Sequence, residues 1–272
     1  MPEHTGTPID FHCQTWGDAS RPTLVMLHGF MGYSGDFADL ATALADKYFC
    51  MAVDLPGHGA TTVSSPDGFD FLVCAEQLCS FLDRRGTGRC FLYGYSMGAR
   101  LALHLALSYP DCWTGLILES GSPGLRTKEE RELRANSDES LARQIESEPL
   151  NLFLERWLAQ PLFRSLHEEG RAQELLRSRA DNDPNGLASA LRGMSTGRQP
   201  SHWEDIDQLG IPTLLITGQK DLKFTSVAKQ MAAAQAGINH QVVADAGHNV
   251  HFERPSEFAT VVLEFLRKHG SH

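Results

Sequence analysis

The sequence predicts an α/β protein: a doubly wound, mostly parallel sheet into which a helical cap is inserted. Apolar runs typical of buried strands alternate with helical spacing over most of the 272 residues, as in parallel sheets with right-handed crossovers. From about residue 123 to residue 200 this alternation gives way to short, charged helical segments. We therefore expect a core domain, residues 1–122 and 201–272, and a cap, residues 123–200. The cap would cover the carboxyl ends of the strands, where open α/β sheets bind ligands.

The individual elements follow from apolar periodicity and from the glycines and prolines that interrupt it. The expected strands are 23–27, 49–53, 90–93, 115–119, 212–217 and 240–243. The expected core helices are 36–45, 71–82, 101–107, 224–236 and 256–268. Within the cap, the helical segments are separated by Pro149, Pro161, Pro184 and Pro200.

The chain is organised around the turn Gly94-Tyr95-Ser96-Met97-Gly98, between the third expected strand and the helix after it. A G-x-S-x-G pattern in this context is typical of a nucleophile elbow, a sharp turn that exposes the serine hydroxyl above the sheet. The glycines are needed because side chains beside the serine would collide with the flanking backbone. Ser96 would lie at a helix N-terminus, where free N–H groups favour negative charge. It is the predicted catalytic serine.

A catalytic serine needs a histidine, which is itself oriented by a carboxylate. In an elbow fold both follow the serine in the chain, the acid first, each just beyond a strand. Asp221 follows the fifth expected strand and His248 follows the sixth. His251 is the only nearby rival to His248. The sequence thus predicts a triad of Ser96, His248 and Asp221.

Such a site also needs two backbone N–H groups that stabilise an oxyanion, one after the serine and one in the loop after the first strand. Met97 and Phe30 occupy these positions. His28 opens the same loop and could be catalytic itself, but a residue there more often ties the loop down by hydrogen bonding.

Composition limits the classes of function. The formal charge of −10 argues against nucleic acid as a partner, because backbone phosphates would be repelled. A small acidic ligand remains compatible, since clustered arginines can override the overall sign. The six cysteines are scattered without metal-ligand spacing, so we expect neither a disulfide framework nor a metal site. There is no apolar run of membrane-spanning length, and residues 1–4 do not resemble a signal peptide, which predicts a cytoplasmic protein. Composition says nothing about oligomeric state.

Over essentially its full length the chain resembles the α/β-hydrolase superfamily. More narrowly, it is similar to the 2-succinyl-6-hydroxy-2,4-cyclohexadiene-1-carboxylate synthases, the pyruvate-eliminating lyases of menaquinone or phylloquinone biosynthesis. The resemblance rests on the elbow, with Arg100 four residues after its serine, and on Leu27-His28-Gly29-Phe30, Asp54-Leu55-Pro56-Gly57-His58-Gly59, Ser122-Pro123-Gly124-Leu125, Asp221-x-Lys223-Phe224 and Gly247-His248-Asn249-x-His251. At Ala99 the sequence differs from the family, which usually carries glycine there. The additional methyl group has to fit where the helix packs closely, and we expect no change in the chemistry.

The resemblance implies a lyase that needs no metal or organic cofactor. Its substrate would be the small polycarboxylate 2-succinyl-5-enolpyruvyl-6-hydroxy-3-cyclohexene-1-carboxylate, from which pyruvate leaves. Ser96, its proton accepted through His248 and Asp221, would act as a base at a ring carbon. The N–H groups of Phe30 and Met97 would stabilise the enolate oxygen that forms.

The resemblance also carries ligand roles onto three cap residues, Arg134, Trp157 and Arg179, although the alignment of the last could slip to Arg177. Arg100 and Tyr95 are further candidates, because one lies a helical turn beyond the serine and the other lies beside it. Each has a structural alternative: an ion pair for Arg100, packing beneath the elbow for Tyr95, and anchoring of the cap for Trp157.

Arginine usage in the cap supports carboxylate binding independently. Between residues 126 and 200 there are eleven arginines and one lysine, whereas the rest of the chain has seven arginines and five lysines. Guanidinium suits carboxylates because it binds them in a bidentate fork and stays charged. Thirteen acidic residues share the segment, so most of these arginines serve solvated helix faces and salt bridges.

Three functions are compatible with these observations. The first is the lyase, with Ser96 as a base. The second keeps the triad but makes Ser96 a nucleophile, in a hydrolase of an ester, a thioester or a carbon–carbon bond, which would not need converging arginines. The third is a non-catalytic binding protein on the same scaffold, which the presence of all three triad members disfavours.

Overall fold

The computed structural model describes residues 9–270. Residues 1–8 and 271–272 lie outside this description, and with them residues 1–4, on which the signal-peptide expectation rests. Within the described chain, no helix has the length and apolar character that a bilayer span requires.

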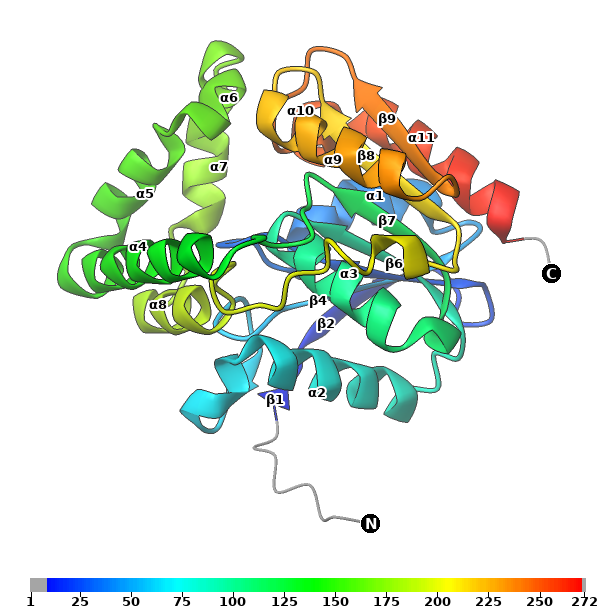
Figure 1. Cartoon of the computed structure of the whole chain (residues 1–272), viewed down its shortest axis with the longest axis horizontal. Helices are drawn as coiled ribbons and strands as arrows, with labels where there is room; N and C mark the ends of the chain where they lie inside the picture. Colours follow the sequence, from blue (N-terminus) through cyan, green and yellow to red (C-terminus); the bar gives the residue numbers. More distant parts are fainter. Residues whose placement is uncertain (1–8, 271–272) are drawn as a thin grey trace.

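A seven-stranded sheet forms the centre of the protein (Figure 1). Its strands lie in the order β2 (Cys13–Trp16), β4 (Phe49–Val53), β3 (Thr23–Leu27), β6 (Cys90–Tyr95), β7 (Trp113–Glu119), β8 (Thr213–Gly218) and β9 (Ile238–Val243). All neighbours are parallel except β2 and β4. A separate two-stranded antiparallel sheet pairs β1 (Ile9–Asp10) with β5 (Thr62–Val63).

Parallel pairing brings the carboxyl ends of six strands to one edge of the sheet. Leu27 at the end of β3 pairs with Gly94 of β6, and Tyr95 of β6 pairs with Glu119 at the end of β7. At the other side of the sheet, the last residues of β8 and β9 are also paired. The loops that follow these strands therefore lie together, which is what positions the site.

Helices cover both faces of the sheet because its strands are apolar on both sides. One face packs against α2 (Phe71–Arg84), α3 (Met97–Ser108) and α9 (Leu222–Ala234). The other packs against α1 (Ala38–Leu44) and α11 (Pro255–His269). The one-turn helix α10 (Val250–Glu253) precedes α11, and short 3₁₀ turns are η1 (Ser34–Phe37), η2 (Pro66–Phe69), η3 (Pro110–Cys112), η4 (Pro161–Phe163) and η5 (Ile206–Gln208).

Between β7 and β8 the chain forms five helices, which lie together at the left of the view (Figure 1). They are α4 (Lys128–Ser147), α5 (Leu150–Leu158), α6 (Arg164–Glu168), α7 (Ala172–Arg179) and α8 (Pro184–Gly193). Thr127 and Glu130 form a capping box that starts α4. Two apolar clusters hold the helices together, one from α4, α5 and α8 that also includes Met31 of the loop after β3, and one from α5 to α7. These clusters support the proposed division into a cap, residues 123–200, and a core.

The expected α/β architecture is confirmed, and the six strands expected in the core are all present. The edge strand β2, antiparallel to β4, was not expected, because four residues with one partly polar face give little apolar signal. The one-turn helix α10 was also not expected, and its position next to His248 matters for the site.

Candidate active site

The turn from β6 to α3 has the backbone geometry of a nucleophile elbow. Ser96 has φ 50° and ψ −103°, a conformation that costs free energy for a residue with a side chain. A Cβ atom on Gly94 would lie 2.4 Å from the carbonyl oxygen of Gly98, and one on Gly98 would lie 2.2 Å from that of Leu27. Both glycines are therefore required for the helix to approach the sheet this closely.

Three side chains from three loops form a hydrogen-bonded chain. His248 Nε2 lies 3.0 Å from Ser96 Oγ, and His248 Nδ1 lies 2.7 Å from Asp221 Oδ2. Both His248 and Asp221 are buried. With Nδ1–H donating to the carboxylate, Nε2 is free to accept the serine proton. Asp221 is also the N-cap of α9, since it accepts a hydrogen bond from the N–H of Phe224.

The rival histidine has a different partner. His251 donates through Nδ1 to Glu119 at 2.8 Å, and its backbone N–H donates to the other oxygen of the same carboxylate at 3.0 Å. The Tyr93 hydroxyl also donates to Glu119. His251 is thus part of a buried polar cluster behind the elbow, and it has no contact with Ser96 among the hydrogen bonds of the described chain.

Phe30 and Met97 line the same cavity as Ser96. Met97 is the first residue of α3, so its N–H has no acceptor within the helix. Phe30 lies in the loop after β3, held against α3 because the N–H of Gly98 donates to the carbonyl of His28. Both residues border the cavity beside Ser96, and their role as oxyanion donors stays a prediction.

His28 ties its loop down, as expected. Its Nε2 accepts a hydrogen bond from the N–H of Leu55 at 2.9 Å, and its Nδ1 donates to the carbonyl of Gly29 at 2.8 Å. Burial lowers the pKa of His28 below its usual value, which keeps the ring neutral and suits both bonds. A catalytic role for His28 is not needed to explain its position.

A cavity of about 860 Å³ opens between the cap and the carboxyl edge of the sheet. The triad and all seven other residues predicted for the site line it. Apolar and aromatic side chains from both domains complete the wall, among them Leu154, Leu158, Phe163, Leu191, Met194 and Phe224. An apolar chamber with a few charged groups is typical of a small-molecule site.

Arg100 has no carboxylate partner among residues 9–270. Its Nη1 donates to the carbonyl of Met194 at 2.9 Å and to Gln199 Oε1. The ion pair considered for it is therefore absent from the described chain, and its role in binding a ligand stays a prediction. Burial is the main cause that lowers its pKa to about 9, and the Arg134 charge adds to it. The residue stays protonated at neutral pH, and its Nε–Nη2 edge is available for a carboxylate.

The two cap arginines differ from Arg100, because each already has a carboxylate partner. Arg134 Nε donates to the buried Asp138 at 2.8 Å. Arg179 is buried and forms a bidentate pair with Asp36, at 2.6 and 2.7 Å. Arg177 is exposed and is not among the residues that line the cavity, so the cavity position belongs to Arg179.

Trp157 and Tyr95 each pack against neighbouring aromatic rings and also line the cavity. The Trp157 ring lies 5.3 Å from that of Phe30 and is stacked 5.9 Å from that of Phe153, so it links the cap to the first loop and also lines the cavity. Tyr95 is buried 5.5 Å from the His248 ring and 4.9 Å from the His251 ring, with part of its surface in the cavity.

Comparison with known proteins decides the family. The sequence model of the alpha/beta hydrolase fold matches residues 22–255. The 2-succinyl-6-hydroxy-2,4-cyclohexadiene-1-carboxylate synthase of Serratia proteamaculans is 34% identical over 255 residues, which cover 93% of this chain and 96% of that protein. The chain belongs to the α/β-hydrolase fold family and to its 2-succinyl-6-hydroxy-2,4-cyclohexadiene-1-carboxylate synthase branch. Proteins of this branch are lyases built on the hydrolase fold, so the chain is a member of an enzyme family.

Two further relatives agree with this assignment. The solved structure of MenH from S. aureus superimposes with a TM-score of 0.89 at 31% identity and covers 96% of this chain and 99% of that one. The chloroplastic protein PHYLLO of Arabidopsis thaliana is 31% identical over 271 residues, covering 93% of this chain. The chain spans only 16% of the length of PHYLLO, so it corresponds to one part of that larger protein.

The departure from the synthase pattern at Ala99 is accommodated by a neighbour. Ala99 is fully buried, and its methyl group lies 2.7 Å from where a Cβ on Gly121 would stand. A side chain at position 121 would collide with this methyl group, so Gly121 leaves the room that Ala99 occupies. The departure does not alter the elbow.

Several residues of the site were not predicted. Asp36, the partner of Arg179, lies 143 positions earlier in the chain. Ser120 donates its hydroxyl to the carbonyl of His248 at 2.8 Å, and Glu253 binds the backbone on both sides of that histidine. Their roles depend on how distant loops meet, for which the sequence pattern gives no signal. Within residues 9–270 no cluster of three or more potential metal ligands occurs.

Proposed function

We propose that the chain eliminates pyruvate from 2-succinyl-5-enolpyruvyl-6-hydroxy-3-cyclohexene-1-carboxylate to give 2-succinyl-6-hydroxy-2,4-cyclohexadiene-1-carboxylate. The observation that carries this proposal is that Arg100, which has no carboxylate partner among residues 9–270, lines the same cavity as the Ser96–His248–Asp221 chain. A hydrolase of simple esters has no use for a partly buried cation beside its serine, whereas a polycarboxylate substrate supplies a partner for it.

The chemistry follows from the two ring systems. The double bond of the substrate starts at C3, those of the product start at C2 and C4, and the C5–oxygen bond breaks. The proton must therefore leave C2, which carries the succinyl group. Ser96 Oγ takes this proton as its own passes to His248 Nε2, and the electron pair moves through the ring to expel enolpyruvate. His248 then returns a proton to the leaving group, which tautomerises to pyruvate.

The backbone would stabilise the charge that builds up before the leaving group departs. Removing a proton from C2 places negative charge on the adjacent succinyl carbonyl oxygen, as in an enolate. The N–H groups of Phe30 and Met97 are the proposed donors to that oxygen. Arg100, Arg134 and Arg179 would bind carboxylates, and Trp157 and Tyr95 would pack against the ring. Since Arg134 and Arg179 are already paired, Arg100 is the primary carboxylate ligand in this proposal.

The proposal is tested by giving the purified full chain the enolpyruvyl substrate and measuring pyruvate and the conjugated diene together. We expect equal amounts of both from wild type and almost none from Ser96→Ala, with little hydrolysis of simple aryl esters by either. Efficient ester hydrolysis with an acyl group trapped on Ser96, and no pyruvate from the enolpyruvyl substrate, would instead support the hydrolase. Wild-type turnover by Ser96→Ala would exclude Ser96 both as the base and as a nucleophile.

A further inference from the structure

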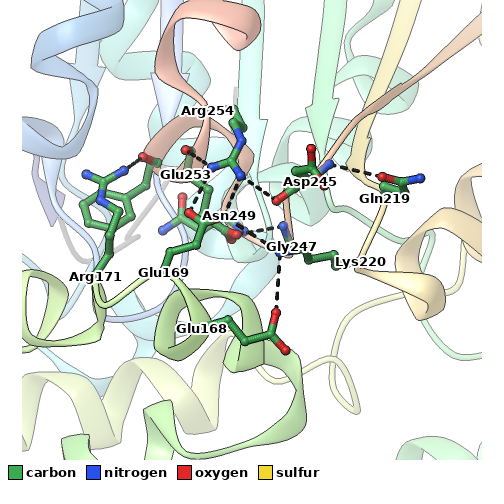
Figure 2. Close-up of polar contacts among 11 residues, drawn as sticks. Glu168, Glu169, Arg171, Gln219, Lys220, Asp245, Gly247, Asn249, Glu253 and Arg254 are labelled. Carbon is green, nitrogen blue, oxygen red and sulfur yellow. Dashed lines mark hydrogen bonds and ion pairs between the residues drawn. The ribbon is translucent and has the colours of Figure 1, made fainter.

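The backbone around His248 is held by a second buried carboxylate, that of Glu253 at the end of α10 (Figure 2). Its Oε2 accepts a hydrogen bond from the N–H of Gly247 at 2.8 Å, and its Oε1 accepts one from the N–H of Asn249 at 3.2 Å. These two amides lie on either side of His248. Glu253 is only 4% exposed, so solvent does not compete for these bonds.

Glu253 restrains the backbone from which the histidine side chain projects. The N–H of Asn249 belongs to the peptide plane that follows His248, and the N–H of Gly247 belongs to the plane one residue before the histidine's own N–H. The two bonds therefore hold the loop on both sides of the histidine Cα. Ser120 adds a third constraint on the carbonyl of His248 itself. Asp221 orients the imidazole ring from one end, whereas Glu253 and Ser120 hold the backbone from which the ring projects.

Burying the Glu253 carboxylate costs free energy, because the charged form loses its contact with water. Burial raises the pKa of its carboxyl, and the hydrogen bonds from the two amides oppose that rise. Ser165 of the cap helix α6 packs against Gly247 and Glu253. A Cβ on Gly247 would lie 2.0 Å from Ser165 Oγ and 3.0 Å from Glu253 Oε1. A buried carboxylate is retained only where its acceptor oxygens are used, and here they are used by the catalytic loop.

The next residue forms a separate, more exposed contact that offers a control. Arg254 makes a bidentate ion pair with Glu169, at 2.9 and 2.6 Å, and also donates to the carbonyl of Asp245 (Figure 2). Lys220 lies 3.8 Å from the same Glu169 carboxylate. This ion pair joins the cap to the core beside the His248 loop, but it does not bind the amides that flank the histidine.

We propose that Glu253 is a positioning residue that holds His248 in the orientation in which Nε2 meets Ser96 and Nδ1 meets Asp221. The proposal rests on the proposed function only for the reaction used in its kinetic test. In Glu253→Gln one oxygen becomes an NH₂ group, which cannot accept from either backbone amide, so one of the two bonds is lost. In Glu253→Asp the carboxylate is kept on a shorter side chain.

The experiment compares wild type, Glu253→Gln, Glu253→Asp and the matched control Glu169→Gln. Pyruvate release gives kcat and KM, thermal unfolding gives stability, and NMR of histidine-labelled protein reports the ring tautomer of His248. The His248 signals are identified by their loss in His248→Ala. We expect kcat of Glu253→Gln to fall about 10- to 100-fold with little change in KM, and its His248 signals to broaden or split. The kcat of Glu253→Asp should lie between those of wild type and Glu253→Gln. Glu169→Gln should keep the kinetics and the His248 signals of wild type.

Each other outcome overturns the proposal or separates it from the proposed function. A folded Glu253→Gln variant with wild-type kcat and His248 signals would show that the contact does not position the histidine. If both Glu253 variants fail to fold, the residue serves folding and the positioning role is rejected. If wild type releases no pyruvate, the proposed function fails, while the NMR comparison in the resting protein still decides the role of Glu253.

Discussion

Replacing Arg100 by methionine removes the guanidinium and keeps much of the side-chain volume. Within residues 9–270 this cation makes side-chain hydrogen bonds only to uncharged oxygens, those of Met194 and Gln199. Its loss therefore leaves no protein carboxylate unpaired, and the resting enzyme should stay folded. The carboxylate that loses its partner is that of the bound substrate.

The size of the effect follows from the burial of the site. Removing one partner of a buried ion pair costs about 3–5 kcal/mol, and about 1.4 kcal/mol corresponds to a factor of ten in rate or affinity. We therefore expect kcat/KM for pyruvate release to fall by roughly two to four orders of magnitude. If the carboxylate is bound equally in the ground state and the transition state, the loss appears mainly in KM.

A matched control is Arg192→Met on the cap. Arg192 pairs with Glu139 and Glu146 on the surface and is not among the residues that line the cavity. Exposed pairs contribute at most about 1 kcal/mol each, so this variant should lose some thermal stability and keep its kinetics. If Arg100→Met, folded as wild type by circular dichroism, retained kcat/KM within about threefold, our assignment of Arg100 to carboxylate binding would be refuted.

Three further predictions follow from the geometry. Asp221→Asn should lower kcat for pyruvate release by about 10⁴-fold, because an amide cannot hold the His248 ring in the tautomer that the 2.7 Å bond now selects; a loss below tenfold would argue against the triad. Gly98→Ala places a methyl group 2.2 Å from the carbonyl oxygen of Leu27, so urea unfolding should show a loss of about 1–3 kcal/mol or more, and an unchanged midpoint would contradict the close approach. Burial lowers the pKa of His58 from 6.5 to about 3, so the unfolded chain binds more protons than the folded one between these values. The unfolding free energy should fall as pH drops from 6.5, by up to about 1.4 kcal/mol per pH unit from this residue, and His58→Gln should have a shallower slope in urea titrations at several pH values.

The elbow and the acid–histidine order were predictable because both are local patterns read in chain order. Gly94 and Gly98 indicate a close backbone approach, and Asp221 and His248 each come shortly after a strand that the sequence predicts. The structure brings these side chains into one hydrogen-bonded chain. Their catalytic roles remain our proposal.

What the sequence did not reveal depends on contacts between distant segments. Arg179 was predicted from resemblance, but its pairing with Asp36 requires the cap to fold onto the first loop. Glu253 gave no signal, because a glutamate next to an arginine and close to a proline is usually a surface charge. Its burial follows from the one-turn helix α10, which folds the chain back onto the amides beside His248.

The distinction between Arg100 and the other arginines could also come only from three-dimensional packing. Composition shows that the cap is rich in arginine and also in acidic residues, and it cannot say which are paired. Arg192 and Arg254 are paired with glutamates, whereas Arg100 is not paired with a carboxylate among residues 9–270. Its place one helical turn from Ser96, together with the lack of a carboxylate partner among the described residues, makes Arg100 the proposed ligand for the substrate.

The most direct test of the central claim follows the hydrogen at C2 of the ring. Substrate carrying deuterium at C2 is converted by wild-type protein, and the ring product is analysed by mass spectrometry alongside the released pyruvate. Elimination with Ser96 as the base predicts a diene that has lost the deuterium, one pyruvate for each diene formed, and unchanged substrate with Ser96→Ala. A ring product that keeps its deuterium and gains the elements of water would mean that the triad hydrolyses its substrate, and would contradict the account.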